Sequence, residues 1–124
     1  MKISNILYVI DTHTEGEPTR IILAGLPRLE GNNILEKREI ISKDLDWVRT
    51  SVLMEPRGHK DQFGAIVLPP HERNVDYALI FMATGGFLDM CCHAVIAVTT
   101  ALIETGVIEP KDLIRMLGMR QRLE

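Results

Sequence analysis

The stretch MCCHAVIAVTTALIETG, residues 90–106, decides the fold. It predicts a helix over 93–105, because the residues there are apolar on nearly every side and Gly106 stands where a C-terminal capping glycine belongs. A helix that is apolar all round is normally enclosed by other structure. We therefore expect strands wrapped around this helix.

The start of this helix is the candidate functional site. Helix N-termini carry unpaired N–H groups and the positive end of the dipole, so they bind anions and favour a thiolate. Cys91 and Cys92 are therefore candidate bases or nucleophiles, with His93 as a possible acid–base group and the amides as a carboxylate cradle. Because successive helical residues project roughly 100° apart, the two thiols cannot act on opposite faces of one small substrate. The alternative is that both cysteines pack as small hydrophobes.

Four short apolar runs predict the surrounding strands. Residues 6–10 and 20–24 flank a polar stretch that contains Gly16, which is typical of a hairpin. Residues 63–68 and 76–82 predict two further strands, joined by a turn. We expect all four to belong to one sheet.

Between residues 32 and 55 the period changes to that of one amphipathic helix covering the sheet. Asn33, followed three residues later by Glu36, predicts a capping box at its start. Residues 109–124 contain no strand-like run, so a short amphipathic helix or a frayed end is expected there. The apolar positions of the predicted helix are Ile34, Ile41, Leu45, Val48 and Val52.

Composition excludes several classes of protein. The 124 residues make one domain or a fragment of a longer protein, with 46% apolar and 25% charged residues. A net charge of -3 gives no basic surface for nucleic acid and no polybasic patch for a membrane. No apolar run approaches the ~20 residues of a membrane span, and the start does not resemble a signal peptide. The two adjacent cysteines are too close for an ordinary disulfide, and free thiols fit the cytoplasm.

A metal site is a rival interpretation, although we expect none. Zinc sites use separated ligand pairs, so three consecutive residues cannot all reach one tetrahedral ion. The polar loop over 55–61 is either a simple connection or a wall of the site. Other possible ligands are Asp11, His13, Glu15, His59, Asp61 and His71.

Three motifs in the same order resemble the proline racemase family, which includes proline racemase, 4-hydroxyproline 2-epimerase and trans-3-hydroxy-L-proline dehydratase. They are DTHTEGEPTRI (11–21), EPRGHKDQFGAIVLPP (55–70) and MCCHAVIAVTTALIETG (90–106). The resemblance runs from about residue 6 to 108. It divides the chain into an N-terminal domain, 1–108, and a tail outside the resemblance, 109–124.

The resemblance implies the α+β fold of diaminopimelate epimerase. In that fold two similar domains, each a curved and mostly antiparallel sheet around a central helix, enclose the site between them. This chain corresponds to the first domain alone. In the family a thiolate removes the α-proton and a thiol on the opposite face returns one, without a cofactor or a metal. The helix start is expected to lower the pKa of the catalytic thiol.

Residue by residue, Cys91 matches the reactive cysteine and His93 the histidine near the substrate amine. Cys92 stands in place of the family's glycine in the substrate-binding segment, where its side chain could crowd the pocket. The segment that carries the second thiol has no counterpart in this chain. We therefore expect an isomerase that acts at the α-carbon of proline or hydroxyproline and needs a complementary C-terminal half or forms a homodimer. The alternatives are the family's dehydratase, a truncated non-catalytic remnant, and a thiol-reactive or metal-binding module built on residues 91–93.

Overall fold

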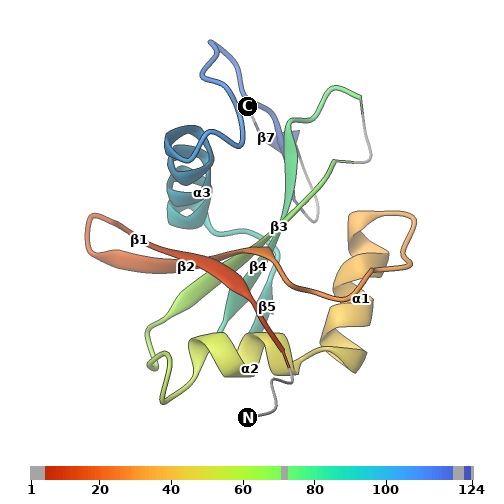
Figure 1. Cartoon of the computed structure of the whole chain (residues 1–124), viewed down its shortest axis with the longest axis vertical. Coiled ribbons are helices and arrows are strands. Elements are labelled where there is room, and N and C mark those ends of the chain that lie inside the picture. Colours follow the sequence, from red (N-terminus) through yellow and green to blue (C-terminus); the bar gives the residue numbers. More distant parts are fainter. Residues whose placement is uncertain (1–4, 71–72, 119–121, 124) are drawn as a thin grey trace.

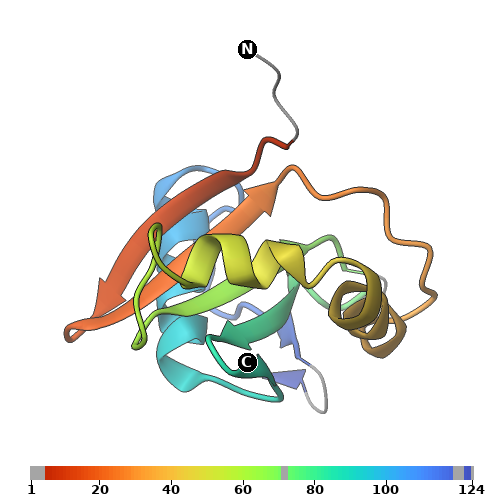
Figure 2. The same cartoon turned by 90° about the horizontal axis from the view of Figure 1, so that it is seen from below.

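The chain forms one mixed sheet with helices on both faces (Figures 1 and 2). The computed structural model describes residues 5–70, 73–118 and 122–123. Within them the strand order is β1-β2-β3-β4-β6-β7, and β5 also pairs with β4. Parallel pairing joins β2 to β3 and β4 to β6, and the other pairs are antiparallel. The elements are β1 (Tyr8–Thr14), β2 (Glu17–Ala24), α1 (Ile34–Asp44), α2 (Trp47–Leu53), β3 (Phe63–Leu68), β4 (Tyr77–Ala83), β5 (Gly86–Leu88), α3 (Cys92–Glu104), β6 (Met116–Leu117) and β7 (Arg122–Leu123).

The central strand β4 is buried on both faces, because α1 and α2 cover one side of the sheet and α3 the other. Ile80 and Met82 belong to the core beneath α1 and α2, whereas Leu79 and Phe81 belong to the core beneath α3. This alternation follows from the period of two in a strand. The strands predicted over 63–68 and 76–82 are confirmed.

The predicted hairpin is confirmed, but its strands are longer than the apolar runs indicated. The polar residues 11–14 and 17–19 belong to β1 and β2, so only Glu15 and Gly16 form the turn. Both have positive φ angles, of 51° and 87°, as the favoured two-residue hairpin turns require.

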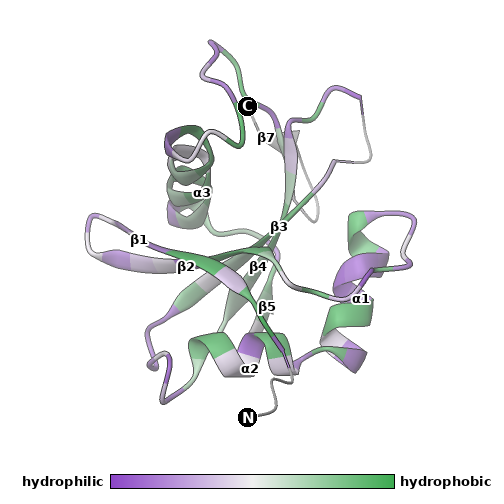
Figure 3. Ribbon diagram, viewed as in Figure 1, coloured by the Kyte–Doolittle hydropathy of each residue, from purple (hydrophilic) through white to green (hydrophobic). Residues whose placement is uncertain are grey.

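The single helix expected over 32–55 is wrong, because two helices occupy this segment. Leu45 leaves the helical conformation with φ of -128° and ψ of 26°, and α2 begins two residues later. The apolar pattern concealed this break, since Ile41 before it and Val48 after it are both fully buried against the same sheet. Figure 3 shows hydrophobic and hydrophilic bands along both helices.

The predicted cap of the first helix is confirmed. The Asn33 side chain accepts a hydrogen bond of 2.9 Å from the Glu36 N–H. The Glu36 carboxylate accepts a bond of 2.7 Å from the Asn32 N–H, one residue before the usual capping-box partner.

The expected helix or frayed end near the C-terminus is wrong for 116–117 and 122–123. There β6 extends the sheet beside β4, and β7 pairs with β6. Met116 is 2% exposed in the core beneath α3, and Asp76 exchanges two hydrogen bonds with the Arg115 backbone that fix this edge. A strand of two residues gives no periodicity that a sequence pattern could reveal.

The central helix is confirmed as α3, which begins one residue earlier than predicted and ends before Gly106. The strands do not wrap it completely, however. It packs on β1, β2 and β3, while Ile96 on its outer face is 57% exposed. Among the described residues, no helix is both long enough and apolar enough to cross a bilayer.

Candidate functional site

The site begins at Cys91, which is the N-cap residue of α3. Its backbone is extended, with φ of -150° and ψ of 103°, and its carbonyl accepts the first helical hydrogen bond from the Val95 N–H at 3.1 Å. The half-buried sulfur makes no side-chain cap hydrogen bond, although the nearby N–H groups of Ala94 and His93 act to lower the pKa of its thiol. The helix start therefore directs amide dipoles at this thiol.

Residues of three elements surround His93, whose imidazole lies beside that sulfur. The Cys91 Sγ atom lies 3.3 Å from Nδ1 and 3.7 Å from Nε2. The ring makes a T-shaped contact with Phe63 at the start of β3, with centroids 4.8 Å apart and planes at 86°. The Thr14 hydroxyl at the tip of β1 donates a hydrogen bond of 3.2 Å to the His93 carbonyl. Sequence reasoning predicted Cys91 and His93 together but missed Phe63 and Thr14, which approach only in the folded sheet.

The expected lowering of the thiol pKa is wrong. Burial raises the pKa of the Cys91 thiol above its usual value, and the N–H groups of Ala94 and His93 offset only part of this effect. The neighbouring Cys92 and the carboxylate of Glu17 raise this pKa further. Removing the thiolate from water therefore outweighs the stabilisation that the helix start provides.

Cys92 differs from its neighbour in its surroundings. It is the first residue of α3, its side chain is exposed, and both cysteines are free thiols. The two thiols therefore belong to consecutive residues at the start of α3, one half-buried and one exposed.

The possible metal ligands do not gather. Among the residues that the structure describes, no three His, Cys, Asp or Glu side chains form a group that could hold an ion, and His71 lies outside those residues. His13 accepts the Gly16 N–H at 3.4 Å, and His59 accepts the Asp61 N–H at 3.1 Å. Asp11 forms an ion pair with Arg20 at 2.7 Å.

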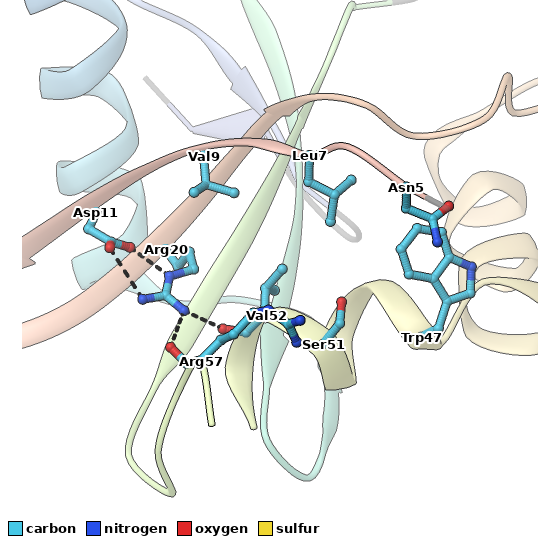
Figure 4. Close-up of a pocket in the computed structure, with 9 residues that line it drawn as sticks. All are labelled: Asn5, Leu7, Val9, Asp11, Arg20, Trp47, Ser51, Val52 and Arg57. Carbon is cyan, nitrogen blue, oxygen red and sulfur yellow. Dashed lines mark hydrogen bonds and ion pairs between the residues drawn. The ribbon is translucent and has the colours of Figure 1, made fainter. Parts of the chain in front are cut away.

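Arg20 is a third residue that the sequence pattern did not single out (Figure 4). Its guanidinium donates to both carboxylate oxygens of Asp11, at 2.7 and 3.2 Å, and to the carbonyls of Val52 at 2.7 Å and Arg57 at 2.5 Å. It thereby ties the hairpin to the end of α2 and to the loop over 55–61. The signal was present in the hairpin register, which places Asp11 directly opposite Arg20.

A hollow of about 730 Å³ lies beside this arginine, on the face of the sheet that α2 covers. Its lining residues come from the N-terminal segment, the hairpin, α2 and the loop after it, and Cys91 is not among them. The thiol and this hollow are therefore separate features of the molecule.

Comparison with known proteins gives consistent matches. A family model described as proline racemase matches residues 9–119. The proline racemase of Clostridioides difficile is 46% identical over 108 residues, which are 87% of this chain and 32% of that protein. The crystal structure of a probable proline racemase from Agrobacterium radiobacter K84, with bound carbonate, superimposes with a TM-score of 0.82 at 27% identity, over 91% of this chain and 35% of that one.

A hydroxyproline epimerase from Agrobacterium vitis, solved with bound trans-4-OH-L-proline, gives a TM-score of 0.81 at 25% identity over 90% of this chain and 34% of its own. These likenesses confirm the predicted α+β fold of the diaminopimelate epimerase type. The chain spans about a third of the length of the relatives that it matches.

Proposed function

The chain belongs to the proline racemase family, and we propose that its Cys91 thiol is one of two acid–base groups that invert the α-carbon of proline or hydroxyproline. The observation that carries the proposal is the position of the Cys91 sulfur. It lies at the start of α3, beside the N–H groups of His93 and Ala94 and 3.3 Å from the imidazole Nδ1. A proton donor or acceptor, an imidazole and an anion-binding helix end thus meet within one turn.

The helix start supplies the groups that an imino acid requires. Its N–H groups and dipole favour a carboxylate, and the backbone N–H of Cys92 contributes even though its side chain replaces the family's glycine. A carboxylate held there brings the α-carbon next to the Cys91 sulfur. The imidazole of His93 then faces the ring nitrogen of the substrate.

The reaction is a balanced exchange of protons. A thiolate accepts the α-proton, and the electron pair left on the α-carbon is delocalised into the bound carboxylate. A thiol on the opposite face then donates its proton to that carbon, which inverts the centre. No electron is gained or lost overall, so the step needs no redox cofactor.

The raised pKa of Cys91 assigns it the thiol form at neutral pH, so in the resting site it is the proton donor. The thiolate must then come from the opposite face of the substrate. Cys92 is a poor candidate for it, because it directly follows Cys91 in the chain at the same start of α3. The proposal therefore includes a complementary C-terminal half that carries the second group.

A second candidate is a chain that binds imino acids without turnover. It is favoured by the side chain of Cys92, which stands at the helix start in place of the family's glycine and narrows the space next to the bound molecule. In this case the helix start still binds the carboxylate.

Proton exchange separates the two candidates. The chain is incubated in D₂O with L-proline or trans-4-hydroxy-L-proline, alone and with the C-terminal half of a relative, and loss of the α-proton signal is followed by NMR. The racemase proposal predicts exchange that Cys91→Ser abolishes and that the matched Cys92→Gly variant retains.

Amide spectra of residues 93 and 94 provide the second readout. Shifts on addition of proline without exchange, even with the second half present, would support binding alone. If neither shifts nor exchange are observed, both candidates are contradicted.

A further inference from the structure

Lys37 is a buried cation far from the thiol. It is 8% exposed, and it is the only buried lysine, arginine or acidic side chain among the described residues. No hydrogen bond or ion pair of its ammonium is found within the part of the chain that the structure describes. Lysines are rarely buried to this extent without a partner, because even partial removal of the charge from water is costly.

The position of Lys37 within its helix adds to this cost. It is the fourth residue of α1, close to the positive end of the helix dipole, where a cation is unfavourable and an anion is favourable. Both effects are relieved by a negative group placed next to the ammonium.

A hollow of about 720 Å³ adjoins this side chain. It lies between the segment 23–32 and the end of β3, and Lys37 belongs to its lining. The one described side-chain polar atom that is fully buried and unbonded is the Thr19 hydroxyl oxygen, so the Lys37 ammonium is not sealed in the core. It therefore keeps some contact with solvent, and the lysine side chain lines the hollow.

The segment over the lysine is held in place by the core. Figure 2 shows it arching away from the sheet between β2 and α1, and Leu26 and Leu29 pack against the core beneath α1. A Cβ atom added at Gly31 would lie 2.9 Å from the Lys37 backbone nitrogen and 3.0 Å from its Cγ. The backbone at Gly31 thus rests directly on the lysine stem, which leaves only the ammonium end free to act.

The lining carries a local excess of positive charge in a chain whose net charge is -3. Lys37 and Arg28 are its cations, and Glu30 is its carboxylate, which lies beyond ion-pair distance of the lysine.

We propose that this hollow is a binding site for the oxyanion group of a small molecule, a phosphate or a carboxylate, with Lys37 as its principal ligand. An ammonium is a compact point charge with three donors, which suits either oxyanion. The site is distinct from the Cys91 region, because α1 and α3 lie on opposite faces of the sheet (Figure 1).

The test is an NMR titration of the ¹⁵N-labelled chain at constant ionic strength, with inorganic phosphate in one arm and acetate in the other. We expect saturable shifts of the Gly31 and Lys37 amide signals, and the arm with the tighter binding identifies the oxyanion. Lys37→Met keeps the aliphatic stem and removes the charge. The affinity of this variant for the anion should fall by roughly ten- to a hundredfold, the factor expected from the loss of one charge-assisted hydrogen bond.

Two controls keep the result decisive. Lys43→Met removes an exposed lysine from the same helix and should bind as the wild type does, while Lys37→Arg retains the charge and should retain binding. The proposal is overturned if neither anion produces saturable shifts at Gly31 and Lys37 in the wild type. It is also overturned if a folded Lys37→Met variant binds the anion as tightly as the wild type does. The same holds if the amide signal of Lys43 shifts as much as those of Gly31 and Lys37.

Discussion

Replacing Arg20 with methionine tests how the hairpin is attached to the rest of the fold. Methionine keeps much of the aliphatic volume and removes all the donors of the guanidinium. Arg20 is 17% exposed, whereas Asp11, its ion-pair partner, is 63% exposed. The Val52 carbonyl that Arg20 binds at 2.7 Å is partly buried, and the Arg57 carbonyl is exposed.

The expected cost follows from these exposures. The ion pair with the exposed Asp11 contributes about 0.2–1 kcal/mol after solvent screening. Loss of the charge-assisted bond to the Val52 carbonyl, which then lacks a partner, costs about 1.5–3 kcal/mol. The exposed Arg57 carbonyl binds water instead and adds little. Arg20→Met should therefore lower the free energy of unfolding by about 2–4 kcal/mol, most of it from the Val52 carbonyl.

Urea denaturation, followed by the fluorescence of the single Trp47, measures this change. Asp11→Asn is the matched control, because it removes the ion pair but leaves the guanidinium bonded to both carbonyls. We expect Asp11→Asn to cost less than about 1 kcal/mol. The reasoning is refuted if the two variants lose the same stability, since the surface ion pair would then be the main contact.

Three further predictions concern single positions. The raised pKa of Cys91 should make its alkylation by iodoacetamide slow until the pH lies well above the ordinary thiol value of about 8.5, whereas the exposed Cys92 should react first. Mass spectrometry of the Cys92→Ser variant follows Cys91 alone, and rapid alkylation of Cys91 at pH 7 would contradict the raised pKa. Gly58→Ala should unfold the chain substantially because its Cβ would lie 2.0 Å from a backbone oxygen, while Gly85→Ala, with no atom within 4 Å, should leave the melting temperature nearly unchanged. The Arg115 N–H and then the Lys111 ammonium lower the pKa of Asp76. The ionised Asp76 carboxylate therefore stabilises the fold above about pH 4, and this stabilisation is lost as the pH falls through the lower folded-state pKa. The free energy of unfolding of Asp76→Asn, measured by chemical denaturation, should fall less steeply over this acidic range.

The sequence predicted those features that depend on local chemistry. The hairpin, β3, β4, the Asn33 cap and α3 all follow from short-range patterns, and the structure contains each of them. The break at Leu45 and the strands β6 and β7 did not follow, because nothing in their own residues marks them. Their conformations are set by packing on a sheet that forms from distant segments.

The same division applies to the site. Cys91 and His93 are neighbours in sequence, so their proximity was predictable, whereas the direction of the pKa shift was not. That direction depends on how deeply the sulfur is buried, and burial depends on strands that lie far from it in the chain. A helix start lowers the pKa of a thiol only where water or donors reach the sulfur well enough to stabilise its charge.

The Arg20 contacts and the candidate site are linked through one strand register. Parallel pairing of β2 with β3 sets Thr19 opposite Phe63 and Arg20 opposite Gly64. The ring of Phe63 packs against that of His93 in a T-shaped contact. Since a slip of one residue would turn every side chain of β3 to the other face, the same register that places Arg20 beneath α2 also places Phe63 beside the imidazole. The Arg20 contacts and the thiol site therefore depend on the same register, although they lie on opposite faces of the sheet.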